Sequence, residues 1–163
     1  MRAALIRDGR PCSSRGGHLK VQQLGHVVLK VRDRESSEGF YAEVLGLPIA
    51  ARMDEPPITF FTLGNHHDFA IMAVGTDGPD AAANSPGLEH VAFKVGESIE
   101  DLRRAKAYLD ALGVEIADIE DHTVSQSIYF NDPDGNAIEV YVDTSDVWRT
   151  DRQAVASIAP LTL

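Results

Sequence analysis

The chain has 163 residues, of which 44% are hydrophobic and 25% charged, enough for one domain with a real core and too few for two independent ones. The formal net charge of −10 argues against binding to nucleic acids or anionic membranes, and no stretch approaches the roughly 20 apolar residues of a membrane span. The single cysteine, Cys12, excludes an intrachain disulfide and agrees with a reducing cytoplasm, where we expect the protein to be located.

The first half of the chain predicts one strand, one helix and three further strands. Residues 1–20 contain several Arg, Gly and Ser residues and are expected to form a flexible tail. The apolar and β-branched run 24–31 predicts a buried strand. Residues 35–45 have helical spacing and end at Gly46, where a helix-terminating glycine is expected. Three short strands are then predicted at residues 47–52, 58–63 and 68–74.

The second half predicts the same order of elements. A strand at 88–95 precedes an amphipathic helix at 98–112, which Ser98 is expected to cap and Gly113 to end. Strands are predicted at residues 114–119, 127–130 and 137–142. The turn Asp132–Asn136 joins the last two strands, and we expect its acidic side chains to face solvent.

Two segments, Leu24–Val31 and Leu88–Val95, share the pattern L-x-H-V-x-hydrophobic-K-V, and their histidines are 64 residues apart (90 − 26). The chain is therefore predicted to contain two βαβββ repeats, residues 22–75 and 86–143, within one domain at 21–143. Residues 144–163 lack clear periodicity and are expected to form a C-terminal extension. Each repeat is too small to bury both faces of its sheet, so pairing of the repeats is expected to create a cleft suited to a ligand.

Three side chains in this arrangement have metal-ligand chemistry. His26 and His90 occupy matching positions in the two repeats. Glu139 lies between Ile138 and Val140, and strand alternation points it to the opposite face from them. A carboxylate in so apolar a strand needs a partner. Because two histidines and one carboxylate form the ligand set of non-haem Fe(II) oxygenases, the pattern predicts a metal site at His26, His90 and Glu139.

The repeat symmetry also indicates that this site is open. The two helix-ending glycines, Gly46 and Gly113, are 67 residues apart, and this offset maps Glu139 onto Met72. Methionine is a poor ligand for a hard or borderline metal. A fourth protein ligand is therefore not expected, which leaves positions for a bidentate substrate.

These features resemble the vicinal oxygen chelate superfamily of glyoxalases, bleomycin-resistance proteins and dioxygenases. The resemblance rests on the paired βαβββ units, the His…His…Glu pattern and the segment Tyr129–Glu139, and it covers about Leu24–Asp143. Within the superfamily the chain is most similar to the type I extradiol (catechol 2,3-) dioxygenases. The resemblance implies an α+β fold whose two repeats pair into one curved mixed sheet around a metal cleft. Many of those enzymes also carry a second, non-catalytic copy of the paired unit, which these 163 residues do not contain.

The same resemblance assigns catalytic roles to His67, His122 and Tyr129. His67 precedes the last strand of the first repeat, where a histidine of those enzymes acts as acid and base near dioxygen. Tyr129 stands ten residues before Glu139, as in those enzymes, and its phenol is expected to hydrogen-bond the substrate. His122 resembles a histidine that hydrogen-bonds the catechol oxygen, with a shorter gap to Tyr129 than in the larger enzymes.

The resemblance thus implies cleavage of a catechol-type aromatic diol by O2 at a mononuclear Fe(II) site, with Mn(II) as the alternative metal. The implied partners are the small aromatic diol and O2, without nucleic acid or membrane. A homo-oligomer, a dimer or larger, is expected because small members of the superfamily often pair.

Two other functions stay open. One is another metal-dependent activity: a glyoxalase-like lyase or isomerase, an epimerase, or a thiol transferase to fosfomycin. Met72 weighs against the four-ligand members of that group, and the His67–Tyr129 pair separates the dioxygenases from the three-ligand transferases. The other is a metal-free drug-binding resistance protein, against which the His26, His90 and Glu139 triad argues.

Overall fold

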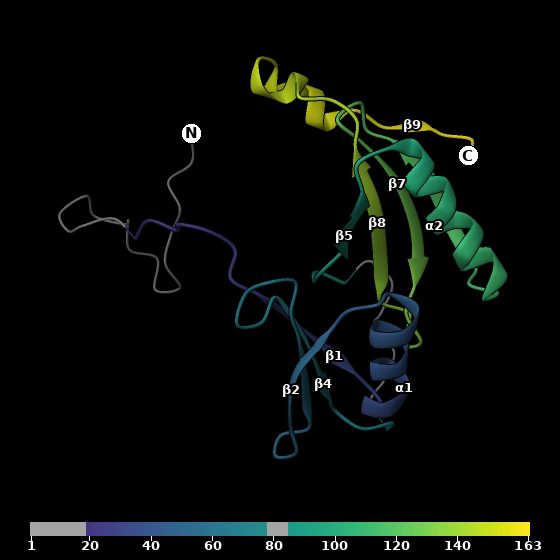
Figure 1. The fold of residues 1–163 in the computed structure, drawn as a ribbon. Helices are drawn as coiled ribbons and strands as arrows, with labels where there is room; N and C mark the ends of the chain where they lie inside the picture. The colour runs from purple at the N-terminus through teal and green to yellow at the C-terminus, as the bar shows by residue number, and fades with distance from the viewer. Residues whose placement is uncertain (1–18, 78–84) are drawn as a thin grey trace.

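The computed structural model describes residues 19–77 and 85–163. Most of the expected tail and the middle of the segment between the repeats therefore lie outside the described residues. The described chain consists of two βαβββ units and a C-terminal segment (Figure 1). The α+β fold class and the duplicated order of elements expected from the sequence are confirmed. Within the described residues, no helix has the length and apolar character needed to cross a membrane.

The first repeat forms a four-stranded sheet with one helical segment. Strand β1 (Val27–Val31) leads into helix α1 (Arg34–Gly39), which continues as the π-helix η1 (Phe40–Val44). The sheet is completed by β2 (Ile49–Met53), β3 (Ile58–Phe61) and β4 (Phe69–Ala73), in the order β1-β4-β3-β2. Gly46 follows the helical segment at φ 69°, the left-handed conformation that a terminating glycine adopts readily.

The second repeat has the same topology, extended by one strand. It contains β5 (His90–Gly96), α2 (Ile99–Ala111), β6 (Ile116–Asp121), β7 (Ser125–Asn131) and β8 (Ala137–Asp143). The Ser98 side chain accepts a hydrogen bond from the backbone N–H of Asp101 and caps α2, as the sequence predicts. In both repeats the first and last strands pair in parallel, β1 with β4 and β5 with β8.

The repeats form two sheets rather than the single curved sheet expected from the sequence. In the described residues β1 and β5 are end strands of their sheets, and neither is paired with the other. The repeats instead share one apolar core, in which Phe69 of β4 packs edge-on against Phe93 of β5 at a centroid distance of 5.6 Å. The two sheets are therefore held together by side-chain packing and not by strand pairing.

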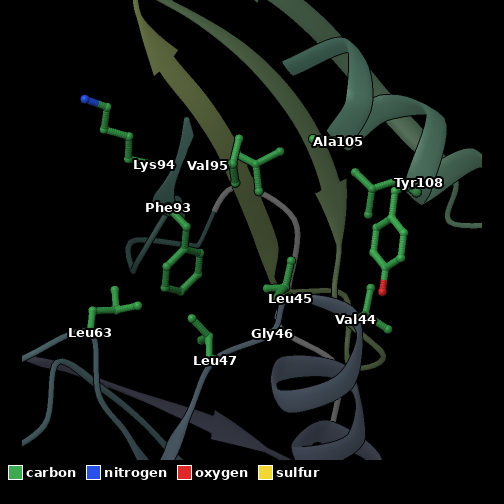
Figure 2. A pocket seen from close by; sticks show the side chains of 12 residues that line it. Val44, Leu45, Gly46, Leu47, Leu63, Phe93, Lys94, Val95, Ala105 and Tyr108 are labelled. Atoms are coloured by element: carbon green, nitrogen blue, oxygen red, sulfur yellow. The ribbon is translucent and has the colours of Figure 1, made fainter. Parts of the chain in front are cut away.

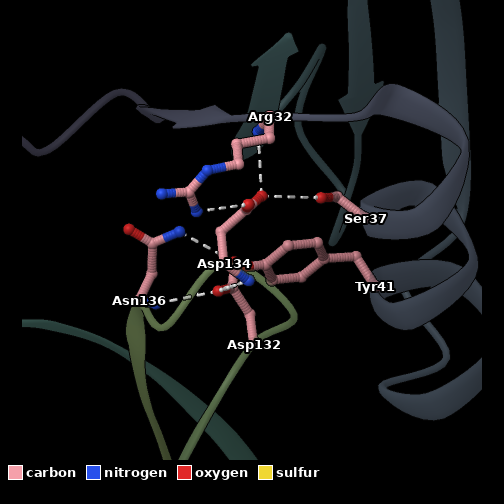
Figure 3. A network of polar contacts seen from close by, with 6 residues as sticks. All are labelled: Arg32, Ser37, Tyr41, Asp132, Asp134 and Asn136. Atoms are coloured by element: carbon pink, nitrogen blue, oxygen red, sulfur yellow. Dashed lines mark hydrogen bonds and ion pairs between the residues drawn. The ribbon is translucent and has the colours of Figure 1, made fainter. Parts of the chain in front are cut away.

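A polar network also joins the repeats, between α1 and the turn that connects β7 to β8 (Figure 3). Asp134 in this turn accepts hydrogen bonds from the backbone N–H of Arg32 (2.9 Å), from the Arg32 guanidinium (3.0 Å) and from the Ser37 hydroxyl (3.4 Å). Contacts between charged and hydrogen-bonding groups at these distances fix the turn against the first repeat.

Asp132 is the buried centre of this network. Its carboxylate is only 5% exposed and accepts a hydrogen bond from the Tyr41 hydroxyl at 2.9 Å. It also accepts from two backbone N–H groups of its own turn and from the Asn136 amide. The expectation that the acids of this turn face solvent is therefore wrong: turn and helix close around Asp132, and the Asp134 side chain is 12% exposed and pairs with Arg32. Burial and the Asp132 charge raise the pKa of Tyr41 far above its ordinary value, so its hydroxyl remains a donor.

The C-terminal segment returns to the second sheet. After two short 3₁₀ helices, η2 (Val147–Arg149) and η3 (Arg152–Ala156), strand β9 (Ala159–Pro160) pairs antiparallel with β6. Figure 1 shows this segment at the far end of the second repeat, away from α1. The extension is thus part of the second sheet.

Candidate functional site

The second repeat brings together two of the three expected metal ligands. His90 opens β5, Glu139 lies on the neighbouring parallel strand β8, and His90 Nε2 is 3.0 Å from Glu139 Oε2. The Glu139 side chain is 10% exposed, whereas the His90 side chain is 37% exposed. A buried carboxylate beside a partly accessible imidazole is a donor pair suited to a divalent metal.

Ser127 holds the Glu139 carboxylate in place. It is fully buried on β7, and its hydroxyl donates to Glu139 Oε1 at 2.5 Å. Such a partner orients a metal-ligating carboxylate. Sequence reasoning missed this residue, although Ser127 stands two positions before Tyr129 and strand alternation puts both on the face of Glu139.

Tyr129 and His122 lie next to this pair. Tyr129 is the direct cross-strand neighbour of Glu139, and its ring packs edge-on against His90 at a centroid distance of 5.7 Å. Its hydroxyl is 2.9 Å from His122 Nε2. Burial, followed by the Glu139 charge, raises the pKa of Tyr129 to about 12, so the phenol keeps its proton at neutral pH.

These residues border an open cavity of about 410 Å³, the polar cavity. His90, His122 and Tyr129 line it together with Glu89, Asp118, Glu120, Ala137 and Ile158. Every charged side chain in this lining is a carboxylate, unless a histidine is protonated. The polar cavity therefore has a negative electrostatic character.

The third expected ligand, His26, lies in a separate cluster in the first repeat. It immediately precedes β1, and its ring is 4.2 Å from that of His67, which also contacts Phe60. His66 Nδ1 is 2.7 Å from His67 Nδ1. Desolvation, with the neighbouring His26 and His66, lowers the pKa of His67 and favours its neutral form.

The structure therefore divides the six predicted residues into two half-sites. The histidine pair is His26 with His67, and the second-repeat cluster is His90, Glu139, Tyr129 and His122. Across residues 19–77 and 85–163, no three His, Cys, Asp or Glu side chains gather into a group able to hold a metal ion. In one copy, the predicted ligand set does not fit a three-ligand metal site.

The strand pairing corrects the symmetry comparison for Glu139. Ala92 pairs with Glu139 in the second repeat, and the equivalent Val28 pairs with Ala70 in the first. The position that matches Glu139 is thus Ala70 rather than Met72, because the offset between the repeats grows along the chain. Alanine carries no donor atom, so the inference that the first repeat offers no ligand here is unchanged.

A second cavity, of about 380 Å³, lies between the repeats near α2, and most of the side chains that line it are apolar. Figure 2 shows side chains of both repeats around it, including Leu47, Leu63 and Phe93. The one charged residue in its lining, Lys94, forms ion pairs with Glu97 and Asp143. None of the six predicted site residues lines this cavity.

Residues 23–140 match the family model of the Glyoxalase/Bleomycin resistance protein/Dioxygenase superfamily. The chain belongs to this superfamily. The glyoxylase/bleomycin resistance protein/dioxygenase domain from Frankia sp. EAN1pec has the same fold, with a TM-score of 0.65 and 24% identity over 77% of this chain and 100% of that one.

Relatives within the superfamily differ in activity. Biphenyl-2,3-diol 1,2-dioxygenase 3 of Rhodococcus globerulus is 30% identical over 123 residues, which are 74% of this chain and 63% of that protein. The chain thus spans less than two thirds of this dioxygenase. Glutathione transferase FosA of Serratia marcescens is 32% identical over 126 residues, or 75% of this chain and 82% of that protein.

Proposed function

We propose that the protein is an extradiol dioxygenase that cleaves a catechol-type aromatic diol with O2. The observation that carries this proposal is the second-repeat cluster, in which Tyr129 and His122 are hydrogen-bonded beside the His90–Glu139 pair. Similarity to an enzyme named for a biphenyl diol supports it. In this reaction one ring carbon–carbon bond breaks and both atoms of O2 enter the product, so no external reductant is needed.

The cofactor in this proposal is Fe(II), with Mn(II) as the alternative, held by His26, His90 and Glu139 when the half-sites meet. Such a metal supplies Lewis acidity and a template for the substrate. The residues of the chain have separate tasks. Tyr129 and His122 bind and orient a substrate hydroxyl, and His67 accepts and returns a proton. These roles follow from the side chains themselves and include no step at the metal, because one copy does not bring the three ligands together.

We propose that a second copy of the chain brings the half-sites together. The Asp132 and Asp134 network ties the two repeats of one copy to each other, which opposes a rearrangement within the chain. The end strands β1 and β5 carry the two histidines at their N-terminal ends, and unpaired strand edges are suited to pairing with another chain. Apolar side chains beside these histidines are exposed, Leu24 by 81% and Leu88 by 57%. A two-fold dimer would then contain two equivalent sites.

Mixing two defective variants tests the shared site. His26→Ala and His90→Ala should each lose metal binding and activity as separate preparations. After joint refolding, a mixed dimer contains one site with both substitutions and one intact site, so about a quarter of the wild-type activity and metal content should return. If each site lies within one chain, every site keeps a defect and nothing returns, which would contradict the two-copy proposal.

The activity itself is tested with protein that has been reconstituted with Fe(II) without oxygen and then given a catechol and air. We expect stoichiometric O2 uptake and a yellow ring-cleavage product. Absence of O2 uptake across mono- and bicyclic catechols, in protein shown to contain iron, would exclude the dioxygenase.

A metal-dependent thiol transferase is the second candidate, because the similarity to the glutathione transferase covers more of that protein than the similarity to the dioxygenase does. Consumption of glutathione with an electrophilic substrate, without O2 uptake, would favour it. A preparation that binds no divalent metal under any condition would instead favour a metal-free drug-binding protein.

A further inference from the structure

The C-terminal segment, residues 144–163, reaches the polar cavity through two residues. The Ser157 backbone carbonyl lies 3.0 Å from His122 Nδ1, and Ile158 lines the cavity together with His90 and His122. We propose that this segment is the substrate-selecting wall of the site: Ser157 sets the tautomer of His122, and Ile158 contacts the apolar body of an uncharged or cationic aromatic substrate. This inference rests on the proposed function of the same site.

The wall is anchored on both sides of the contact residues. The backbone N–H of Thr144 donates to the Val124 carbonyl at 2.9 Å, where the segment leaves β8. Beyond Ile158, β9 pairs with β6, the N–H of Leu161 donates to the Ile119 carbonyl, and Leu163 packs against the core. Ser157 and Ile158 are therefore held beside His122 by backbone pairing.

The contact with Ser157 determines where the His122 proton lies. A carbonyl oxygen only accepts hydrogen bonds, so Nδ1 of the ring must carry the hydrogen. In the neutral ring Nε2 then accepts a hydrogen bond from the Tyr129 hydroxyl 2.9 Å away, which is closer than the Glu120 carboxylate at 3.4 Å. The Tyr129 oxygen is left with a lone pair to accept a hydrogen bond from a substrate hydroxyl. The backbone of the C-terminal segment thus positions His122, and through it Tyr129.

Ile158 and the acids of the lining indicate the class of substrate. The Ile158 side chain is 69% exposed although it borders a cavity, so an apolar ligand would gain by covering it. Glu89, Asp118 and Glu120 on the same lining disfavour a substrate that carries a carboxylate or phosphate. An aromatic diol with an alkyl or amino-alkyl substituent matches both features.

Val155 offers a matched control for Ile158. It lies in the same segment and is 58% exposed, but it does not line the cavity. In the full-length, Fe(II)-loaded protein, Ile158→Ala should raise KM for 4-ethylcatechol about tenfold with little change in kcat, and Val155→Ala should leave both unchanged. Equal KM values in the Ile158→Ala variant and the wild type would contradict the proposed contact between Ile158 and the substrate.

The charge of the substrate is tested with three probes that differ in one substituent. Anaerobic titration should give dissociation constants for 4-ethylcatechol and dopamine that are more than about tenfold lower than that of 3,4-dihydroxybenzoate. Equal or tighter binding of the carboxylate would overturn the proposed selectivity.

The tautomer is tested in resting protein by ¹⁵N NMR of the histidine rings, with His122 assigned from His122→Asn. We expect the protonated-nitrogen shift at Nδ1 and the unprotonated shift at Nε2. The opposite tautomer would overturn the role of Ser157. Because the anaerobic titration and the ring shifts need no turnover, they separate a failure of this inference from a failure of the dioxygenase proposal, which O2 uptake decides.

Discussion

The two repeats have the same strand pairing but carry different chemistry at equivalent positions. Where the second repeat pairs Tyr129 with Glu139, the first pairs Phe60 with Ala70. Each of these rings packs against a histidine, but not an equivalent one: Tyr129 contacts His90, whereas Phe60 contacts His67, and the counterpart of His90 is His26. The second repeat thus has a hydroxyl and a carboxylate where the first has a hydrogen and a methyl group.

The two repeats therefore share one scaffold but place different side chains on it. The second repeat has a preorganised acidic cluster, with Glu139 held by Ser127. The first repeat offers the imidazole nitrogens of His26 and His67, whose rings are 4.2 Å apart. Neither repeat is a complete site, so substitutions in each of them measure what it contributes.

The largest effect is expected from Glu139→Gln, which removes the only carboxylate of the predicted ligand set. The amide can still accept the Ser127 hydrogen bond, so the fold should persist while metal affinity falls by more than about 100-fold. Glu89→Gln, at an acid that lines the polar cavity next to His90, is the control and should keep its metal. Metal titration decides, and an unchanged affinity in Glu139→Gln would remove this residue from the ligand set.

The second largest effect is expected from a substitution at His67 in the first repeat. His67→Ala should retain metal but reduce turnover by about 10²- to 10⁴-fold, the usual contribution of a general acid–base group. His66→Ala, the adjacent histidine, should remain close to wild type. Steady-state O2 uptake with parallel metal analysis measures both, and equal losses in the two variants would indicate a structural role instead.

Ser127→Ala tests how far the second repeat is preorganised. Loss of the hydroxyl that orients the Glu139 carboxylate should weaken metal binding by about 10- to 100-fold. Ser125→Ala, two positions earlier on β7, should bind metal as the wild type does. If Ser127→Ala binds equally well, the carboxylate does not need this support.

The smallest effect on the chemistry is expected from Tyr41→Phe, which breaks a contact between the repeats. The Tyr41 hydroxyl donates a hydrogen bond to Asp132. Removing it should lower the free energy of unfolding by about 1.5 to 3 kcal/mol, because the acceptor is charged and buried. Tyr108→Phe, at a half-exposed tyrosine that donates to the Glu43 carbonyl, should change it by less than about 1 kcal/mol. Urea denaturation of both variants gives the comparison, and equal values would contradict a special role of the network.

Much of the fold was predictable because local patterns determine it. Glycines ended both helical segments at Gly46 and Gly113, Ser98 capped its helix, and alternation put Glu139 on the face opposite its apolar neighbours. The adjacency of His90 and Glu139 also follows, since the first and last strands of a βαβββ unit pair.

What the sequence did not reveal depends on contacts between units. Periodicity gives the face of a strand but not which edge meets which, so the separation of His26 from His90 was not foreseen. The burial of Asp132 arises from packing against Tyr41 in the other repeat. Strand β9 lies in an aperiodic segment, and its two residues are too few to form a recognisable strand pattern.

The parallel pairing of β5 with β8 has a consequence for the order of events during folding. His90 and Glu139 are 49 residues apart in the chain (139 − 90), and parallel strands meet only after the crossover between them has been placed. Contacts of such long range carry a large loop-closure cost and form late. The His90–Glu139 pair of a nascent chain therefore forms only after β8 has left the ribosome and docked against β5.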